Sequence, residues 1–546
     1  MQAQALSSNG GATMVTCRAL GQGSRALLAV PAVHPALQRA VHPQKQRRAR
    51  LALRPAAVAE LERVVAPTPS LQPPGQGQKQ VTIVYKFGGS SVATAERLME
   101  VADIVCSFPE HLPCVVLSAM GKTTNLLLQC GDEALRTPPA DIPALAPLKA
   151  IRDLHLETAE KLGVDVATRE EVEALVTQLT QLLVGISIMQ DLTPRAKDSL
   201  VSFGERLSTR LFAAYLNAQG VPARQYDAYQ IGVTTSDNFV NAEVNYELTL
   251  PAVREALTFG ASEQRHLPIV TGFLGRGLQT GAITTLGRGG SDLTCTLLGA
   301  ALGLPEVQVW KDVDGVLTAD PRIVDSATPV SRLTFEEATE LAFFGATVLH
   351  PLAMQPAHDC NVGVRVKNSY NRTAPGTLIT EERDMKDALM TSIVCKNNVT
   401  LVDIGSTRML GQFGFLSQVF EIFSRNKISV DVVATSEVSV SLTLDPAKTL
   451  WERDLIVEEL DGLMQDFEGI AKAHYRRGMA IISLICNVKR TSTILERAFR
   501  VLNREQINVQ MMSQGASKTN IALIVNDTEA KEALRALHEE FFGTPN

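Results

Sequence analysis

The sequence predicts an α/β domain built on a largely parallel sheet, followed by two small α+β modules. From about residue 81 to about residue 390, apolar strand-like runs such as 114–117 alternate with Ala/Leu-rich amphipathic stretches such as 93–105. Such alternation is typical of helices that cover a parallel sheet. After about residue 390, one pattern of helix, strand, turn and strand occurs twice. This repeat indicates two duplicated modules.

The first 75 residues differ in charge from the rest of the chain. No Asp or Glu precedes Glu60, whereas eight basic residues do. A basic, acid-free stretch of this kind resembles an organelle transit peptide, so we expect import into a plastid (chloroplast) and work in its stroma, with a mitochondrion as an alternative destination. A disordered basic tail that binds nucleic acid is the other interpretation. The eight basic residues are Arg18, Arg25, Arg39, Lys45, Arg47, Arg48, Arg50 and Arg54.

The remaining chain is acidic and otherwise ordinary. Of the 546 residues, 45% are hydrophobic and 20% are charged, and removal of the eight early cations changes the net charge from −6 to −14, with 44 basic against 58 acidic residues. This balance argues against nucleic acid as a partner of the working part. We find no uninterrupted apolar run long enough to cross a bilayer, so we expect a soluble protein with no membrane partner.

The cysteines predict neither a disulfide framework nor a metal site. They are scattered without a Cys-x-x-Cys pair, and the His residues lack metal-ligand spacing. Buried, reduced thiols in a reducing compartment are the expectation. The eight cysteines are Cys17, Cys106, Cys114, Cys130, Cys295, Cys360, Cys395 and Cys486.

The α/β domain is predicted to begin after a Pro/Gly/Gln-rich linker at 67–80. Its first strand, 81–85, leads into Lys86-Phe87-Gly88-Gly89-Ser90-Ser91 and then a helix expected over 92–105. Adjacent glycines let the backbone approach an anion, a serine would cap the helix, and the helix N-terminus and the lysine both carry positive charge. We therefore predict an anion-binding loop here, with a tight structural turn as the alternative.

Two common nucleotide-binding motifs are absent from the sequence. Gly121-Lys122-Thr123 imitates the end of a Walker A loop, but Val116 stands where its first glycine belongs. Gly275-Arg276-Gly277 does not complete a dinucleotide fingerprint, because Thr280 occupies the third glycine position. The sequence thus supports neither a P-loop ATPase nor NAD binding.

Three further segments carry side chains suited to a small charged substrate. Thr284–Asp292 places three glycines around Arg288 at a predicted helix start, and Arg grips a carboxylate bidentately; a structural Gly-rich loop is the alternative. Glu205 offers a carboxylate to an ammonium group, or it complements a helix dipole. Residues 310–316 end a strand at acidic and Gly positions, or they form a plain Asp-Gly turn.

Taken in order, these segments resemble the motif set of aspartate kinases. The match runs from about residue 81 to the C-terminus. It implies an amino-acid-kinase fold, a sheet sandwiched by helices, at 78–390. Two interleaved, ferredoxin-like ACT regulatory domains follow at 391–475 and 476–546, and 391–397 supplies a strand to the second. The motifs are Lys86 to Val92, Phe203-Gly204-Glu205-Arg206, Thr284 to Asp292, Asp312-Val313-Asp314-Gly315-Val316 with Asp320-Pro321-Arg322, and Gly345 to Pro351.

The resemblance implies an ATP-dependent phosphorylation of the L-aspartate side chain to 4-phospho-L-aspartate, the first step of lysine, threonine and methionine biosynthesis. Lys86 and Asp292 would be catalytic, with Asp292 organising the catalytic loop. Mg²⁺ would accompany ATP through phosphate oxygens and water rather than a protein cage. ATP would be bound by Lys86, Gly88, Gly89, Ser90, Asp312, Leu317 and Arg322, and aspartate by Thr124, Glu205, Arg288 and Ser291.

Two positions depart from the motifs of the family, and one histidine could be mistaken for a catalytic residue. Thr347 stands where many relatives carry Lys or Gln, so we assign it no contact with ATP. Leu317 replaces a common aromatic residue, which leaves base stacking there open. His350 precedes a proline and an apolar flank, which favours a structural turn over a catalytic role.

The resemblance also implies feedback inhibition by lysine, bound in the first ACT domain. Asp431 would receive the ammonium group of the lysine side chain, although packing of an ACT dimer is the alternative role of this region. A homodimer or a dimer of dimers through the ACT domains is expected, and joint action of S-adenosylmethionine stays open. The matching positions are Met409, Gly414, Phe415, Ser429, Val430, Asp431, Thr435 and Thr443.

Three other functions are less consistent with the sequence. A glutamate or N-acetylglutamate kinase of the same fold is disfavoured by the motifs at 202–206 and 348–351 together with the ACT pair. A catalytically dead amino-acid sensor is disfavoured by the intact charged residues of the site. A fused homoserine dehydrogenase is not expected, because no dinucleotide fingerprint follows the repeat.

Overall fold

The computed structural model describes most of the chain after the leader. The described residues belong to the compact unit Thr68–Asn546. The transit-peptide prediction, Thr347 and Met409 fall outside the described residues. Those residues are 71, 73–75, 80–260, 264–346, 349–384, 388–405, 413–436, 438–444, 457–514 and 519–543.

An eight-stranded sheet forms the core of the α/β part, in the order β3-β5-β2-β1-β8-β10-β11-β9. Every neighbouring pair in it is parallel except β10 and β11. The predicted largely parallel sheet is therefore confirmed. Its strands are β1 (Ile83–Phe87), β2 (Pro113–Leu117), β3 (Ala223–Tyr226), β5 (Leu267–Thr271), β8 (Glu306–Lys311), β9 (Arg332–Thr334), β10 (Gly363–Asn368) and β11 (Thr377–Thr380).

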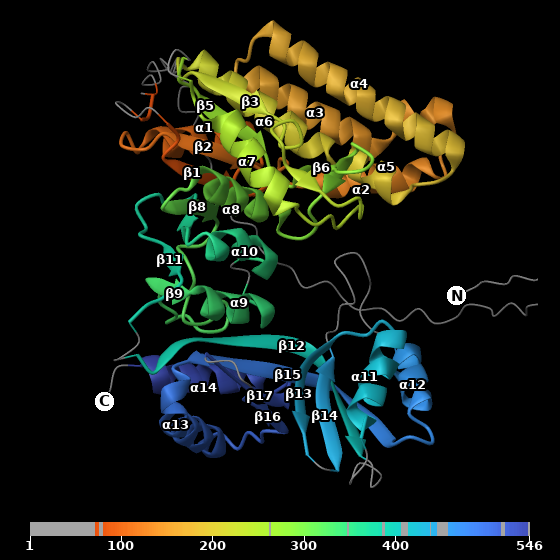
Figure 1. Cartoon of the computed structure of the whole chain (residues 1–546), viewed down its shortest axis with the longest axis vertical. Coiled ribbons are helices and arrows are strands. Elements are labelled where there is room, and N and C mark those ends of the chain that lie inside the picture. The colour runs from red at the N-terminus through yellow and green to blue at the C-terminus, as the bar shows by residue number, and fades with distance from the viewer. Residues whose placement is uncertain are drawn as a thin grey trace, which may run out of the picture. The chain divides into compact units, whose positions relative to one another are not determined.

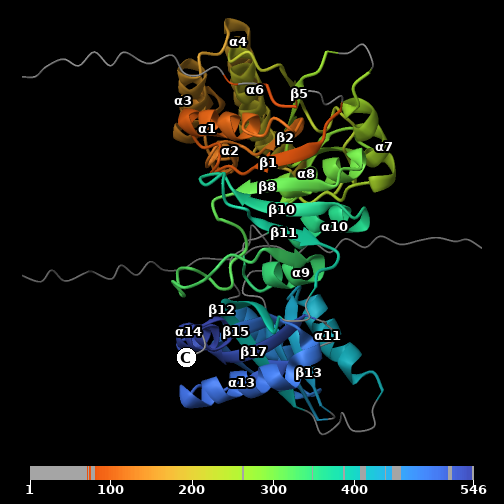
Figure 2. The same cartoon turned by 90° about the vertical axis from the view of Figure 1, so that its left-hand side faces the viewer.

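The central strands are covered on both faces. All five residues of β1, β2 and β5 are buried, and most of them are apolar. Strands with continuous burial rather than alternation are typical of parallel sheets between helical layers. Helices lie around this sheet in both views of the cartoon (Figures 1 and 2). They are α1 (Ala95–Cys106), α2 (Thr123–Ala134), η1 (Pro139–Ala144), α3 (Ala146–Lys161), α4 (Val166–Met189), α5 (Pro194–Val201), α6 (Phe203–Ala218), α7 (Tyr246–Leu257), α8 (Gly290–Leu302), α9 (Phe335–Phe343) and α10 (Pro351–Asp359).

A small second sheet lies beside the first in the chain's α/β part. It has the order β4-β6-β7, with β4 (Thr234–Thr235) parallel to β6 (Leu274–Gly277) and β6 antiparallel to β7 (Ile283–Thr285). Strand β7 leads directly into the predicted Gly-rich segment before α8.

Helix α4 is the longest of the described helices. It has 24 residues and contains an 18-residue stretch with a mean hydropathy of 1.5, so among the described helices it alone is long and apolar enough to span a membrane. Core helices pass the same test. Leu175, Leu179, Leu183 and Ile186 of α4 are buried, and this spacing places them on one stripe of the helix, which packs into the main core.

A six-stranded antiparallel sheet follows, in the order β13-β14-β12-β15-β17-β16. Its two central strands are long and run across the whole sheet, with helices at either end (Figure 1). The strands are β12 (Met390–Gly405), β13 (Val430–Thr435), β14 (Ser439–Leu444), β15 (Lys472–Cys486), β16 (Met511–Ser513) and β17 (Asn520–Asn526). The helices are α11 (Phe415–Arg425), α12 (Val457–Asp466), η2 (Val488–Arg490), α13 (Thr491–Arg504) and α14 (Ala530–Phe542).

This sheet carries two separate hydrophobic cores, which define two modules. The first module packs α11 and α12 on β13, β14 and the end of β12, with Val402 and Ile404 in its core. The second packs α13 and α14 on β17, the end of β15 and the start of β12, with Ile393 in its core. Each long strand thus belongs to both modules.

The internal repeat is visible in the backbone. Helices α11 and α13 are each followed by a left-handed residue, Lys427 with φ 54° and Gln506 with φ 58°, before the chain turns into the next strand. The two copies differ in where the next strand begins, because β13 starts at Val430, three residues after Lys427, whereas β16 starts at Met511, five residues after Gln506. Otherwise the predicted repeat is confirmed.

The segment 316–327, which follows β8, is attached to the second module. Ala319 and Val324 belong to that module's hydrophobic core. The backbone N–H of Ile393 donates to the Thr318 carbonyl at 2.8 Å, and the Thr318 hydroxyl lies 2.9 Å from His538 Nε2 on α14. A loop of the α/β part is therefore built into the core of the second module.

Candidate functional site

The predicted anion-binding loop follows β1 at the carboxyl end of the parallel strands. The Gly89 carbonyl accepts from the Gly121 N–H at 3.0 Å, and a Cβ on Gly89 would lie only 2.9 Å from the Ala119 carbonyl oxygen. Residue 89 must therefore be glycine for the two loops to meet. At Gly88 a Cβ would meet only Lys86 Nζ, at 3.6 Å, so the space above it is open. Ser90 is exposed.

The start of the following helix differs from the prediction. Helix α1 begins at Ala95, and its N-cap is Thr94, whose side chain accepts from the Arg97 N–H at 3.3 Å. Neither serine of the motif caps it, because the buried Ser91 hydroxyl lies 2.8 Å from Ser369 Oγ instead. The helix N-terminus is thus several residues farther from Lys86 than expected.

Lys86 forms a buried charge cluster with Asp292 and a further lysine. Its Nζ lies 2.5 Å from Asp292 Oδ1, and Lys311 Nζ lies 3.8 Å from Asp292 Oδ2. Burial disfavours the Asp292 carboxylate, but the charges of Lys86 and Lys311 outweigh this and lower its pKa. The carboxylate is ionised, so it holds two ammonium groups at one place on the sheet edge.

The second Gly-rich segment passes directly into α8. Gly287 and Gly289 have φ of 68° and 73°, a conformation that favours glycine. A Cβ on Gly289 would lie 2.5 Å from His350 Cβ. Arg288 between them is exposed, and within the described residues it forms no ion pair. Ser291 is half-buried on the first turn of α8, next to buried Asp292.

Glu205 lies in the first turn of α6 and is 3% exposed. Its Oε1 accepts from the Ala119 N–H at 3.2 Å, whereas Oε2 has no hydrogen-bond partner in the described part of the chain. Burial raises its pKa to about 8, although the Ala119 N–H and the Lys86 charge act in the opposite direction. An unpartnered buried carboxylate oxygen beside a lysine-rich cluster is suited to a cationic ligand.

Thr124 begins the helix that follows the same loop. It is half-buried on the first turn of α2, whereas its neighbour Thr123 is buried and donates to the Met120 carbonyl at 2.7 Å. The loop 118–121 therefore contacts both Gly89 and Glu205, and Thr124 follows it at the start of α2.

The positions matched to the nucleotide divide into two groups. Asp312 is exposed directly after Lys311, at the end of β8. Arg322 is 87% exposed in its side chain and pairs with Asp320 at 2.7 Å. The Leu317 carbonyl accepts from Ser392 Oγ of β12 at 2.9 Å. Among the described contacts, none joins Leu317 or Arg322 to the lysine cluster, so only Asp312 lies next to it.

His350 is closer to the charge cluster than the sequence suggested. It is the N-cap residue of α10, as expected for a structural turn, and packs against Gly289. Burial and the charge of Arg288 lower its pKa. Its Nδ1 is buried without a hydrogen-bond partner among the described residues. A neutral imidazole thus lies beside Arg288 and Asp292.

The described residues matched to the lysine effector gather on the first module. Gly414 caps α11 with φ 84°, Phe415 is buried at the helix start, and the Thr443 hydroxyl accepts from the Val432 N–H at 3.1 Å. Ser429 and Thr435 are exposed at the two ends of β13, which begins at Val430.

Asp431 already holds a lysine of the chain itself. Lys396 Nζ of β12 lies 2.7 Å from Asp431 Oδ2, and the two side chains are 14% and 1% exposed. The same ammonium lies 5.2 Å from the ring centroid of Phe343, on α9. Lys396 was not foreseen, because nothing in the sequence shows which strand residue faces Asp431.

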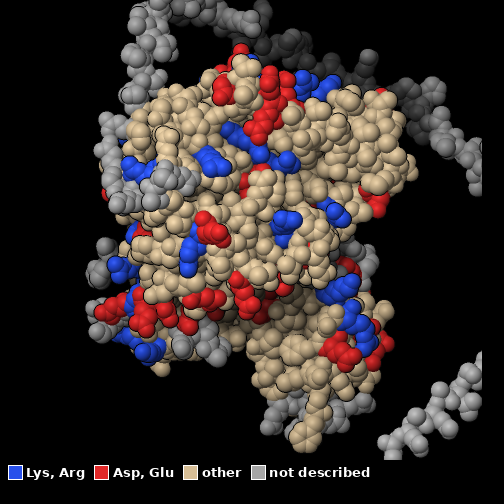
Figure 3. All heavy atoms as spheres, turned by 45° about the horizontal axis from the view of Figure 1, so that its top comes forward, with Lys and Arg blue, Asp and Glu red and all other residues tan. Residues whose placement is uncertain are grey.

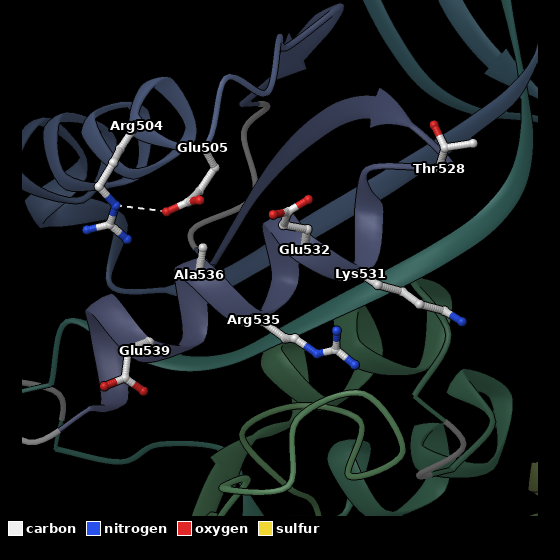
Figure 4. A pocket seen from close by; sticks show the side chains of 8 residues that line it. All are labelled: Arg504, Glu505, Thr528, Lys531, Glu532, Arg535, Ala536 and Glu539. Atoms are coloured by element: carbon white, nitrogen blue, oxygen red, sulfur yellow. Dashed lines mark hydrogen bonds and ion pairs between the residues drawn. The ribbon is translucent and has the colours of Figure 1, made fainter.

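Two surface hollows lie away from these residues. One, of about 710 Å³, lies on α13 and α14 and is lined mostly by charged side chains of both signs, with Arg504 paired to Glu505 (Figure 4). The other, of about 250 Å³, lies between η1, α3 and α4. Neither contains a predicted site residue.

Comparison with known proteins agrees with this geometry. Residues 81–368 match the model of the amino acid kinase family, and residues 482–541 match an ACT domain. The fold and the charged site at the strand ends thus define an amino acid kinase with a regulatory part.

Relatives that match over most of their length identify the family within this class of kinases. The chain is 58% identical over 468 residues to Aspartokinase 3, chloroplastic, of Arabidopsis thaliana, covering 86% of this chain and 83% of the relative. The chain belongs to the aspartokinase family. The structure of E. coli aspartokinase III with aspartate and ADP (R-state) is 34% identical with a TM-score of 0.70, covering 84% of this chain and 100% of that one. Its complex with lysine and aspartate (T-state) is 34% identical with a TM-score of 0.69, covering 84% and 99%.

Proposed function

We propose that this protein transfers the γ-phosphoryl group of ATP to the side-chain carboxylate of L-aspartate, forming 4-phospho-L-aspartate, the first step of lysine, threonine and methionine biosynthesis. The observation that carries the proposal is the meeting of two unlike sites around one loop. Residues 118–121 touch Gly89, beside the Lys86 cluster, and also donate to Glu205. A cationic phosphate site thus adjoins a buried carboxylate suited to an amino group.

ATP is held by its phosphates at the Lys86 loop. Gly88 and Gly89 leave room for the phosphate oxygens, Ser90 is exposed beside them, and Lys86 offsets their charge. Asp292 keeps Lys86 in position and is the second catalytic residue of the pair. Asp312 contacts the nucleotide from the end of β8, and Leu317 and Arg322 contact it from the 316–327 segment.

Aspartate is held by the second half of the site. The Oε2 atom of Glu205 accepts from the substrate ammonium group, and Arg288 binds a carboxylate from the loop before α8. Ser291 and Thr124 donate from the first turns of α8 and α2. The ammonium group and one carboxylate of aspartate are therefore each bound by a side chain of opposite charge.

The chemistry requires no general base. The nucleophile is a carboxylate with an ordinary pKa of about 3.9, already ionised at neutral pH. The obstacle is repulsion between that carboxylate and the phosphates, so catalysis depends on positioning and on charge stabilisation. Asp292 is paired with two lysines and is therefore not available as a metal ligand. The residues present thus fit a Mg²⁺ that is held by the phosphate oxygens of ATP and by water. Bound there, the metal would neutralise further phosphate charge.

Lysine is the feedback inhibitor in this proposal, and it binds the first module at Asp431. The positions that support this are Met409, Gly414, Phe415, Ser429, Val430, Thr435 and Thr443. Their described members lie around α11, β13 and β14. Joint action of S-adenosylmethionine and a homodimer or dimer of dimers through the modules belong to the same proposal.

The proposal also covers the division of the chain into domains and its location in the cell. We assign 1–75 to a transit peptide and linker, 78–390 to the kinase domain, and 391–475 and 476–546 to interleaved ACT domains, with the mature protein in the plastid stroma. The relatives named chloroplastic support a plastid. No nucleic acid or membrane partner is proposed, and on the face in Figure 3 the basic side chains are scattered among acidic ones.

The decisive assay traps the acyl phosphate. The purified chain is given Mg-ATP and hydroxylamine with aspartate, glutamate or N-acetylglutamate in separate reactions. We expect hydroxamate from aspartate alone and suppression of it by lysine. Hydroxamate from glutamate or N-acetylglutamate only, or from none of the three, would refute the proposal.

A further inference from the structure

Asp198 is a buried carboxylate outside the residues assigned so far. It lies on α5 and is 1% exposed. Its two oxygens accept from the Val240 N–H at 3.0 and 2.9 Å, from the Thr285 N–H at 3.0 Å and from the Thr285 hydroxyl at 2.7 Å. These donors lie 42 and 87 positions away in the sequence. A buried carboxylate is costly unless hydrogen bonds satisfy it, so Asp198 ties two distant segments to α5.

Val240 has a backbone conformation that valine rarely adopts. Its φ is 76°, in the left-handed region, where a β-branched side chain is strained. A strained residue persists only where its surroundings hold it, and Asp198 holds Val240 through the backbone N–H. Two residues farther along, the Ala242 N–H donates to the Thr285 carbonyl at 2.9 Å. The loop 236–242 is therefore fastened to Asp198 and Thr285 at two points.

The same loop packs against the Gly-rich segment that carries Arg288. Thr285 is the last residue of β7, three positions before Arg288. Gly287 lies so close to Asn241 that a Cβ at position 287 would collide with Asn241 Oδ1. Arg288 itself is exposed. The place of its guanidinium group therefore depends on the backbone that Asp198 and the loop 236–242 hold.

We infer that Asp198 is a positioning residue for the aspartate half of the site: by holding Val240 and Thr285 it fixes the loop 236–242 and the backbone before Arg288 as one unit. This inference rests on the proposed kinase function, in which Arg288 binds a carboxylate of aspartate. Asp198 does not touch the substrate and acts through the backbone of β7. The ATP phosphates are bound by the loop after β1, so loss of Asp198 affects aspartate binding more than ATP binding.

The test measures initial rates of Asp198→Asn in the full chain. The amide has the size of the carboxylate, but in either orientation its NH2 group faces a backbone N–H that needs an acceptor. We expect KM for aspartate to rise about tenfold and KM for ATP to stay within about twofold of the wild type. Asp165→Ala is the control, because Asp165 also accepts from a backbone N–H, that of Thr168 at 2.7 Å, at the start of α4. It should lose stability without a change in either KM.

Thr285→Val keeps the inference testable if Asp198→Asn does not fold, because it removes only the hydroxyl that donates to Asp198. It should raise KM for aspartate severalfold. Addition of Val240→Gly to either variant should recover part of the affinity for aspartate, because glycine adopts the left-handed conformation without strain. A merely structural role of Asp198 predicts no such recovery.

Amide exchange supplies a measurement that needs no turnover. The backbone amides of residues 285–290 should exchange faster in Asp198→Asn than in the wild type, whereas those of α4 should not change. Unchanged KM for aspartate, equal rises in both KM values, no recovery with glycine, or unchanged exchange at 285–290 would overturn the inference. If the wild type forms no aspartyl hydroxamate, the proposed function fails, whereas the exchange of 285–290 still decides whether Asp198 holds this segment.

Discussion

Glu205 is a buried carboxyl group, and one of its oxygens has no hydrogen-bond partner in the part of the chain that the structure describes. Ionising it there is unfavourable until a cation arrives, which is why burial raises its pKa to about 8. In the free protein near neutral pH it is mostly protonated, and the ammonium group of a bound amino acid would favour its ionised form. Substrate binding and loss of this proton are therefore linked.

The linkage gives a pH prediction. Since only ionised Glu205 attracts the ammonium group, kcat/KM for aspartate should rise with pH and level off above about pH 8, a profile that reports groups of the free enzyme. Glu205→Gln should be far less active and should lack this rise. Initial rates between pH 6 and 9 at saturating ATP measure it, and a flat wild-type profile would contradict the assignment.

The same shift predicts how Glu205 affects stability. Because its folded-state pKa is raised, the folded chain binds an extra proton between the ordinary glutamate value and about 8. Its contribution to stability is thus fully present below that window and is lost as pH rises through it. The free energy of unfolding of Glu205→Gln, measured in urea, should lack this part of the pH dependence. If the free energy changed with pH as steeply as in the wild type, Glu205 would not be its source.

Lys396 predicts how tightly lysine inhibits. Its ammonium group is paired with Asp431, so an effector lysine that binds Asp431 as proposed has to displace it. Lys396→Met leaves Asp431 buried without this cation and should lower stability in the absence of lysine. Half-inhibition by lysine should then need about tenfold less effector, and lysine should raise the melting temperature more than in the wild type. Lys427→Met, at an exposed lysine of the same module, is the control. Unchanged or weaker inhibition would show that lysine does not compete with Lys396.

At the scale of single residues, sequence reasoning found side chains that stand in motifs and missed those that depend on a partner. Lys86 and Asp292, expected in one site, are in contact, and Glu205 joins them through the loop 118–121. Lys311 and Lys396 were missed because each matters through a carboxylate that is distant in sequence. Strand register and packing decide which carboxylate each lysine meets, and a single sequence does not reveal either.

Among the elements, the turn after β1 shows how local chemistry is decided by long-range contacts. A capping serine at position 91 is a reasonable expectation from residue type. Its hydroxyl instead meets Ser369, 278 positions away, and Thr94 caps α1. The strands themselves were easier, because continuous apolar runs such as β1 and β2 have one favourable place, inside a covered parallel sheet.

The two glycines of this turn give a matched pair of variants. Gly89→Ala would place a methyl group 2.9 Å from the Ala119 carbonyl and 3.2 Å from the Gly121 carbonyl, and neither backbone atom yields easily. We expect a loss of about 1–3 kcal/mol in the free energy of unfolding. Gly88→Ala meets only Lys86 Nζ at 3.6 Å, so it should unfold like the wild type. Equal urea midpoints for both variants would contradict this account.

In the molecule as a whole, segment 316–327, which we propose contacts the nucleotide and call the nucleotide segment, is packed against the regulatory sheet. Segment 316–327 contributes Ala319 and Val324 to the core of the second module, and Asn520 of β17 donates to Glu340 of α9 at 2.9 Å. If Leu317 and Arg322 contact the nucleotide as proposed, a change of arrangement in the modules would reach those contacts directly. Coupling of two sites requires such a shared element.

His538 tests that route. It is 2% exposed and bonds to Thr318, so His538→Ala removes a buried contact between α14 and the nucleotide segment. We expect a loss of about 1–3 kcal/mol in stability and a severalfold rise in KM for ATP with little change for aspartate. Glu539→Ala, at the exposed neighbouring position, should leave both constants as in the wild type. An unchanged KM for ATP in His538→Ala would argue against the route.

The two long strands of the regulatory sheet have one more consequence. Because β12 and β15 both continue from one module into the other, with a shift in their pairing register between Lys396 and Leu401, neither copy of the duplication is a separate folding unit. Opening one copy breaks the ladder on which the other is built. Backbone amides on both sides of the sheet should therefore exchange with solvent in a single cooperative event.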